Sequence, residues 1–143
     1  MRHVVTNVLV LKGEEILLHR RAKELLGGGK WGLAGGYLEL NETIAQGAER
    51  EVFEETGYRI KDLTLLKITD NPNRPGEDRQ NVAFVLFCQA LEKEGTPDQE
   101  STVQKWFKLD ELPPKEEIAF DFYDDIQFYV DYMKKSFPLP VIR

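Results

Sequence analysis

The sequence predicts a mixed α/β fold in which a mixed β-sheet lies between helices. Short apolar or alternating runs of strand length recur along the chain, and helical periodicity of apolar residues marks two segments, 43–56 and 120–135. The two kinds of segment follow one another in mixed order, which is typical of a sheet that carries helices on its faces. A chain of 143 residues has the length of one domain, so we expect a single domain over 1–143.

The first strands are expected to form a β-hairpin. Residues 4–11 and 16–20 are rich in β-formers and are separated by the turn sequence Lys12-Gly13-Glu14-Glu15. Residues 31–37 are expected to be extended but interrupted by glycines. Later strands are expected over 62–69, 82–89 and 103–108, with polar loops over 70–81 and 92–100.

The 82–89 run is continuously apolar, which indicates a strand covered on both faces. It contains Cys88, the single cysteine of the chain, so an internal disulfide is excluded. We expect Cys88 to be a small buried side chain.

Both predicted helices have recognisable sequence signals. Thr43 and Gln46 form a candidate capping box at the start of the first, and Gly57 fits a left-handed position at its end. The second helix carries a stripe of apolar residues that packs either on its own domain or on a second subunit. The stripe consists of Phe122, Ile126, Tyr129, Val130 and Met133.

The charge balance narrows the classes of partner. The 25 acidic residues exceed the 19 basic ones and give a net charge of −6, which argues against broad binding of nucleic acid. A small phosphate-bearing ligand stays compatible, because one cluster of arginines or a metal ion suffices to bind it. The apolar runs are too short to span a bilayer and the N-terminus has no secretory signal, so no membrane partner and a cytoplasmic location are expected.

Three glutamates, Glu51, Glu54 and Glu55, crowd the last turns of the first helix. At about 100° per residue they project within about one third of the helix circumference, beside the apolar stripe. Like charges at these spacings repel, and the helix dipole disfavours anions at this end. Only Arg50 is near enough to compensate, and a divalent cation such as Mg²⁺ or Mn²⁺ would remove the repulsion. The alternative is a solvated acidic patch without a role.

A longer pattern surrounds these glutamates. It consists of Gly36, five residues, Glu42, seven residues, and then Arg50-Glu51-Val52-Phe53-Glu54-Glu55-Thr56-Gly57-Tyr58. This segment resembles the Nudix box at every defining position, and such a pattern over 23 residues is highly specific. The flanking segments 17–21, 31–36 and 106–113 are similar to the usual surroundings of the box. The resemblance to the Nudix hydrolases therefore covers nearly the whole chain.

The resemblance implies an α/β/α sandwich in which the box forms a loop–helix–loop. It implies a Mg²⁺ cofactor, replaceable by Mn²⁺, whose ligands are Glu51, Glu54 and Glu55, one of them also a candidate base. The Gly35 carbonyl would be a further ligand. Gly36 would let the backbone turn close to a diphosphate, since it lacks Cβ.

Two further expectations follow from the resemblance. Arg50 would pair with Glu42 and hold the loop against the helix. Glu100 is a candidate base or additional metal ligand, because family members often carry a catalytic glutamate in this loop; the alternative is an ordinary loop glutamate. Many relatives are homodimers, so a homodimer is a candidate assembly.

The activity that the resemblance implies is Mg²⁺-dependent hydrolysis of a diphosphate linkage in a nucleotide. Pro72 follows Tyr58 by 14 residues, and a proline near this place resembles enzymes that cleave ADP-ribose or nucleotide sugars into a nucleoside monophosphate and a sugar phosphate. The alternative for this loop is a plain turn. Strand alternation lets only one of Arg20 and Arg21 face the site, and we favour Arg20. Arg20 and Arg74 are the candidate substrate-binding residues.

Two other functions are also compatible with the sequence. One is a nucleoside triphosphate pyrophosphohydrolase acting on oxidised purine nucleotides, which uses the same metal site and releases pyrophosphate. The other is a regulator that binds nucleotides without cleaving them, which is disfavoured because every carboxylate of the box is present.

Overall fold

The computed structural model describes residues 2–142, and its centre is a mixed sheet. β1 (His3–Lys12) and β2 (Glu15–Arg21) form the predicted antiparallel hairpin, while β1 pairs in parallel with β6 (Asn81–Lys93) on its other side. β5 (Tyr58–Thr69) is antiparallel to β6. The short β8 (Val141–Ile142) extends this edge in parallel to β5.

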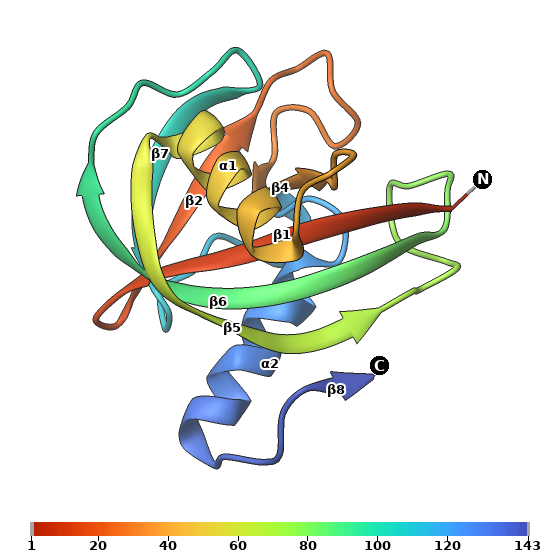
Figure 1. Ribbon diagram of the computed structural model, residues 1–143, viewed down its shortest axis with the longest axis vertical. Coiled ribbons are helices and arrows are strands. Elements are labelled where there is room, and N and C mark those ends of the chain that lie inside the picture. The colour runs from red at the N-terminus through yellow and green to blue at the C-terminus, as the bar shows by residue number, and fades with distance from the viewer. Residues whose placement is uncertain (1, 143) are drawn as a thin grey trace.

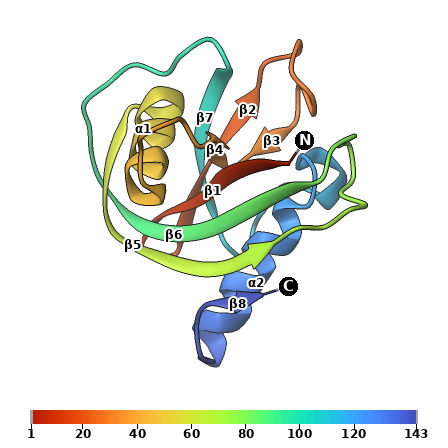
Figure 2. The same ribbon diagram turned by 45° about the vertical axis from the view of Figure 1, so that its right-hand side comes forward.

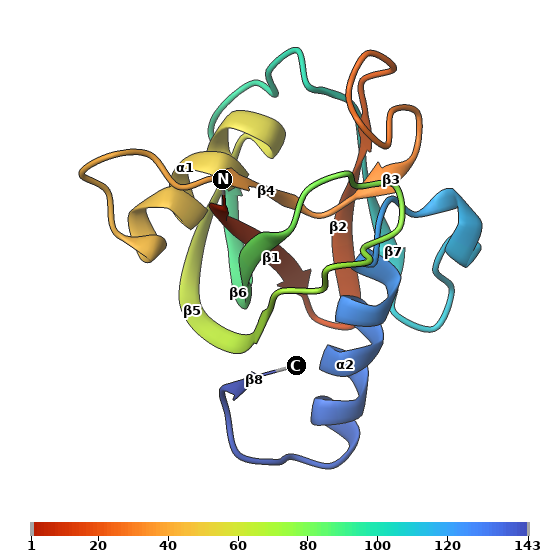
Figure 3. The same ribbon diagram turned by 90° about the vertical axis from the view of Figure 1, so that its right-hand side faces the viewer.

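The sheet splits where β1 and β2 pair with different neighbours. β4 (Ala34–Tyr37) pairs with the first half of β1, whereas β1 meets β2 only at the hairpin end. β2 instead pairs along its length with β7 (Ser101–Lys108), and its end pairs with β3 (Trp31–Gly32). β1 and β2 therefore diverge away from the hairpin, as Figure 3 shows.

The two helices cover opposite faces of the sheet (Figure 1). α1 (Ile44–Thr56) lies on one face, and α2 (Phe122–Lys134), preceded by the 3₁₀ turn Lys115–Glu117, lies on the other. This arrangement confirms the predicted α/β sandwich.

The predicted signals at the ends of α1 are confirmed. The Thr43 hydroxyl accepts a hydrogen bond from the backbone N–H of Gln46 at 3.1 Å, and the Gln46 side chain accepts one from the N–H of Thr43 at 2.8 Å. Gly57 ends the helix with φ +80°. These contacts satisfy backbone groups that a helix end leaves without partners.

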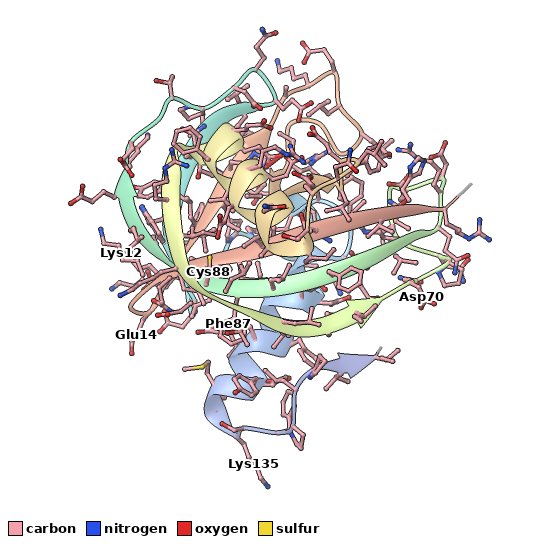
Figure 4. The ribbon with its side chains drawn as sticks, viewed as in Figure 1. Lys12, Glu14, Asp70, Phe87, Cys88 and Lys135 are labelled. Carbon is pink, nitrogen blue, oxygen red and sulfur yellow. The ribbon has the colours of Figure 1, made fainter. Side chains whose placement is uncertain are left out.

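A separate apolar core lies on each face, because successive side chains of β6 point to opposite sides. Phe87 packs against Tyr129 of α2 with ring centroids 5.1 Å apart, while its neighbour Cys88 is buried on the α1 side (Figure 4). The prediction of a buried Cys88 is confirmed, and burial raises the pKa of its thiol to about 12.

The strands extend beyond the apolar runs that predicted them. β5 starts at Tyr58 and β6 continues to Lys93. Backbone pairing between these two ends keeps both strands extended where the apolar side-chain pattern is weak. On α2, Phe122, Ile126 and Tyr129 are buried on the domain itself, whereas Met133 is 61% exposed. Within residues 2–142, no helix is both long and apolar enough to cross a membrane.

Candidate active site

A cleft of about 530 Å³ opens where β1 and β2 diverge. One wall comes from β4 and the buried side of α1, and carries Gly35, Gly36, Glu51 and Glu55. The facing wall comes from the end of β2, the loop between β5 and β6, and the turn before α2. The facing wall carries Arg21, Leu25, Leu26, Arg74, Glu77, Arg79, Phe120 and Phe122.

Glu51 and Glu55 are buried acidic residues, 9% and 2% exposed. Their burial follows from the helical spacing, which places them beside the apolar stripe of α1 as predicted. Loss of solvation, followed by the negative charge of Glu55, raises the pKa of Glu51 to about 7, although Arg50 acts against this shift. Two buried carboxylates held this close favour a cation in the cleft.

Arg50 organises the carboxylates on the outer side of the helix. Its guanidinium donates to both oxygens of Glu42, at 2.8 and 3.0 Å, so the predicted pairing of these residues is present. The same group donates through Nη1 to Glu51 at 2.9 Å and to Glu54 at 3.2 Å. The pKa of Glu42 is held at about 2, mainly by its hydrogen bonds from Arg50.

This network leaves Glu54 at the margin of the site. Its side chain is 46% exposed and does not line the cleft, and Nη1 of Arg50 lies between it and Glu51. Glu55, in turn, is directed toward the N–H of Gly35 and the imidazole of His19. Accordingly, no three His, Cys, Asp or Glu side chains of residues 2–142 converge on one point as a ready metal cage.

The donors nevertheless suit Mg²⁺, which prefers carboxylate and carbonyl oxygens. Glu51 and Glu55 reach the cleft together with Gly35. Burial and the charge of Glu55 raise the pKa of Glu51 in spite of Arg50, and a bound cation would lower it. Glu51, Glu55 and the Gly35 backbone are therefore the groups that would hold the ion, with Glu54 nearby.

Gly36 lies within β4 and lines the cleft, so its expected role beside a diphosphate stays a prediction. The structure adds a second reason for a glycine at this position. A Cβ added there would lie 2.6 Å from Oε1 of Glu51, far inside ordinary contact. The absence of a side chain at 36 therefore makes room for the carboxylate of Glu51.

Glu100 lines the cleft as expected, on the connection between β6 and β7. Figure 2 shows this connection passing over the end of α1, where the N–H of Asp98 donates to the Glu54 carbonyl at 2.7 Å. Desolvation and then the charge of Glu55 raise the pKa of Glu100. The charge of the Glu100 carboxylate is therefore coupled to that of the buried Glu55.

The preference for Arg20 is not supported by the geometry. Arg20 stacks over Trp31, 4.6 Å from the ring centroid, and does not line the cleft. Arg21 lines it instead, because it shares a strand face with His19. The position of His19 beside Glu55 identifies which face is the site side.

Arg74 lies in the cleft as expected, but it is anchored rather than exposed. It forms an ion pair with Asp121 at 2.7 Å and stacks on Phe120 at 4.2 Å from the ring centroid. Its Nη2 is buried without a hydrogen-bond partner among the described residues. Pro72 lines a different hollow beside α2, so the proline itself does not contact this cleft.

Several lining residues were not predicted. Asn7 and Asn81 come from β1 and β6, and Phe120 adopts φ +52° in the turn before α2. No local sequence signal marks them, because Asn7 and Asn81 reach the cleft through strand pairing and Phe120 through the packing of the turn before α2. Only Arg21 had a usable signal, the strand alternation from His19.

The model for the NUDIX domain family matches residues 1–126. The chain belongs to the Nudix family. An oxidized purine nucleoside triphosphate hydrolase of Danio rerio is 32% identical over 134 residues, which cover 93% of this chain and 81% of that protein. A MutT-like protein of Streptomyces ambofaciens is 36% identical over 108 residues, or 76% of this chain. The chain spans 64% of that protein's length and 26% of a putative nudix hydrolase of Caenorhabditis elegans.

Solved structures show the same Nudix fold. An ADP-ribose pyrophosphatase of Streptococcus suis superposes with a TM-score of 0.80 at 20% identity, with both chains fully covered. A NUDIX hydrolase of Nitrosomonas europaea gives 0.83 at 26% identity, covering 99% of this chain and 77% of that one. These likenesses confirm the predicted α/β sandwich, and the family model confirms the predicted family.

Proposed function

We propose that this Nudix chain, acting as one domain over 1–143, hydrolyses the diphosphate linkage of a nucleoside diphosphate derivative with Mg²⁺. One observation carries the proposal: a single cleft has Glu51 and Glu55 on one wall and Arg21 and Arg74 on the other. Carboxylates bind the cation that a diphosphate requires, and guanidinium groups bind phosphate oxygens. A diphosphate with its cation matches both walls.

Each lining group has a role in this proposal. When bound, Mg²⁺ would offset the charge of the diphosphate and make water a better nucleophile. Glu51, Glu55 and the Gly35 carbonyl would hold the ion, and Glu54 would complete the set from the cleft margin. Glu100 would accept the proton of the attacking water, because its raised pKa increases its affinity for a proton.

Arg21 would hold the phosphate. Its Nε donates to the Leu26 carbonyl at 2.9 Å, and its guanidinium lies 5.0 Å from the Phe120 ring centroid. Neither terminal nitrogen has a hydrogen-bond partner among residues 2–142. An arginine fixed at Nε with two free nitrogens is suited to bind a phosphate in bidentate fashion.

The substrate class that we propose first is ADP-ribose or a nucleotide sugar, cleaved to a nucleoside monophosphate and a sugar phosphate. The loop over 70–81 supports this choice, because it supplies Arg74, Glu77 and Arg79 to the cleft. The likeness to the Streptococcus suis ADP-ribose pyrophosphatase adds support at the level of the fold. The cleft volume of about 530 Å³ lies within the range of small-molecule sites.

A second candidate is hydrolysis of oxidised purine nucleoside triphosphates, with release of pyrophosphate. The specific observation in its favour is the 32% identity with the Danio rerio enzyme of that name over 93% of this chain. The same carboxylates and arginines would serve this reaction, so the cleft walls are compatible with both.

The test is turnover with Mg²⁺ on ADP-ribose, nucleotide sugars, dinucleoside polyphosphates, and canonical and oxidised triphosphates, in water enriched in ¹⁸O. Chromatography with mass spectrometry would identify the products and the phosphorus that gains the label. Nucleoside monophosphate plus sugar phosphate supports the first candidate, and pyrophosphate from triphosphates alone supports the second. No turnover with Mg²⁺ or Mn²⁺ would overturn the proposal and favour a nucleotide-binding regulator.

A pair of variants at neighbouring positions tests the phosphate-binding wall. Arg21→Ala is expected to raise KM at least about tenfold, since a hydrogen bond to a charged group contributes about 1.5–3 kcal/mol. Arg20→Ala is the matched control, because Arg20 leaves the same strand but lies outside the cleft. Equal effects of the two changes would contradict the assignment of Arg21.

A further inference from the structure

His19 is a buried polar residue that the proposed chemistry does not yet use. It lies on β2, is 1% exposed, and points toward the end of α1. Its Nε2 lies 3.3 Å from Oε2 of Glu55 and 3.2 Å from the carbonyl oxygen of Leu33. Both neighbours are acceptors, so Nε2 carries the hydrogen in the neutral ring.

The contacts of Glu55 are unequal between its two oxygens. Oε2 lies beside Nε2 of His19 and accepts a hydrogen bond from the backbone N–H of Gly35 at 3.1 Å. Oε1 has no hydrogen-bond partner among residues 2–142. Since Glu55 lines the cleft, the oxygen left for a ligand is Oε1.

His19 joins three parts of the site. It belongs to β2, contacts the carbonyl of Leu33 just before β4, and faces the carboxylate of Glu55 on α1. Gly35, two residues after Leu33, donates its backbone N–H to the same carboxylate at 3.1 Å. The imidazole therefore couples the position of the β4 backbone to the orientation of Glu55.

Packing alone does not account for a histidine at this position. Its Nδ1 is buried without a partner among the described residues, which is unfavourable for folding. Leu17, two residues earlier on the same strand face, is a buried apolar side chain in the α1-side core. An apolar residue at 19 would avoid the orphaned nitrogen, but it would not provide the N–H beside Glu55.

We propose that His19 is a positioning residue that, together with the Gly35 N–H, holds Oε2 of Glu55 and thereby directs Oε1 toward a divalent cation in the cleft. This inference rests on the proposed metal-dependent function. Partners of metal-binding carboxylates commonly affect metal affinity by about 10–100-fold when they are removed.

The test compares His19→Leu, His19→Gln and Leu18→Val. Leucine removes the donor, whereas the amide nitrogen of glutamine reaches the place of Nε2. Leu18→Val is the matched control, because Leu18 is buried on the opposite face of β2, in the α2-side core. Mn²⁺ affinity is measured without substrate by electron paramagnetic resonance, alongside kcat, KM and the thermal midpoint.

His19→Leu is expected to weaken Mn²⁺ binding at least tenfold and to lower kcat more than it changes KM, with an unchanged or higher thermal midpoint. His19→Gln is expected to recover most of the affinity, and Leu18→Val to leave it unchanged. Wild-type Mn²⁺ affinity in His19→Leu would overturn the role of His19 while leaving the proposed function intact. A wild-type protein that binds no Mn²⁺ would overturn both.

A second measurement applies if His19→Leu does not fold. Two-bond ¹H–¹⁵N spectra of the wild-type imidazole would report which ring nitrogen carries the hydrogen. The Nε2–H form, with signals that shift when Mg²⁺ is added, supports the proposal. The Nδ1–H form, or signals insensitive to Mg²⁺, would overturn it.

Discussion

Replacing Gly36 by alanine tests whether this glycine exists to make room for Glu51. The added Cβ would lie 2.6 Å from Oε1, 2.8 Å from Cδ and 3.1 Å from Oε2 of Glu51, whereas ordinary contact begins at 3.4 Å. The carboxylate must therefore move by about 0.8 Å, because carbon and oxygen atoms repel steeply inside their contact distance. Arg50 holds this carboxylate, so a shift of that size would have to break or stretch their contact.

The displacement has two measurable consequences. It would disrupt the hydrogen bond from Nη1 of Arg50 to Oε1, now 2.9 Å, and a charged hydrogen bond contributes about 1.5–3 kcal/mol. It would also misplace a proposed metal ligand by nearly 1 Å, which can lower turnover about a hundredfold. Urea unfolding measures the first effect, and kcat/KM with Mg²⁺ on the preferred substrate measures the second.

A double-mutant cycle with Glu51→Ala identifies the cause. In the Glu51→Ala background there is no carboxylate to displace, so adding alanine at 36 should cost much less stability than in the wild type. Additive effects, or a Gly36→Ala variant with full activity and unchanged stability, would refute the explanation. Gly35→Ala is a more severe change, because its Cβ would lie 2.0 Å from the backbone oxygen of Thr6, which cannot move aside as a side chain can. We therefore expect Gly35→Ala to prevent folding.

The remaining predictions concern charges on either side of the sheet. Glu54→Gln should keep the stability of the partly exposed site and lower turnover at least about a hundredfold, as for loss of a metal ligand or base; near-normal kcat with Mg²⁺ would refute its role. Arg50→Ala should lower activity and reduce the free energy of unfolding by at least about 2 kcal/mol, through the lost bond to Glu51; a stable, active variant would contradict the pairing. Lys67 forms a buried ion pair with Asp125 at 2.7 Å, and Lys67→Met should cost about 3–5 kcal/mol at neutral pH in urea unfolding, by leaving a buried carboxylate without a countercharge. Burial raises the pKa of Asp125 to about 6, so its folded form binds a proton more tightly than the unfolded chain, and the penalty of Lys67→Met should shrink as the pH falls from 7 to 5. An equal penalty at both pH values would show that Asp125 does not titrate in this range.

The sequence by itself was sufficient for the elements whose signals are local. The capping box of Thr43 and Gln46, the left-handed Gly57 and the alternation of the hairpin depend on neighbours in the chain, so they could be predicted without tertiary contacts. The burial of Glu51 and Glu55 beside the apolar stripe also followed from helical geometry alone. The family was evident for the same reason, since its pattern occupies one continuous segment.

Only the tertiary structure decided what stands opposite those carboxylates. Arg21 and Arg74 reach the cleft from segments far apart in the chain. Alternation in β2 does not by itself say which strand face borders the cleft, and the tertiary ion pair with Asp121 anchors Arg74 there. The contact of His19 with Glu55 joins β2 to α1, and no local pattern encodes it. Such contacts depend on how strands pair and diverge, so the metal-binding side of the cleft was predictable from sequence and the side that selects the substrate was not.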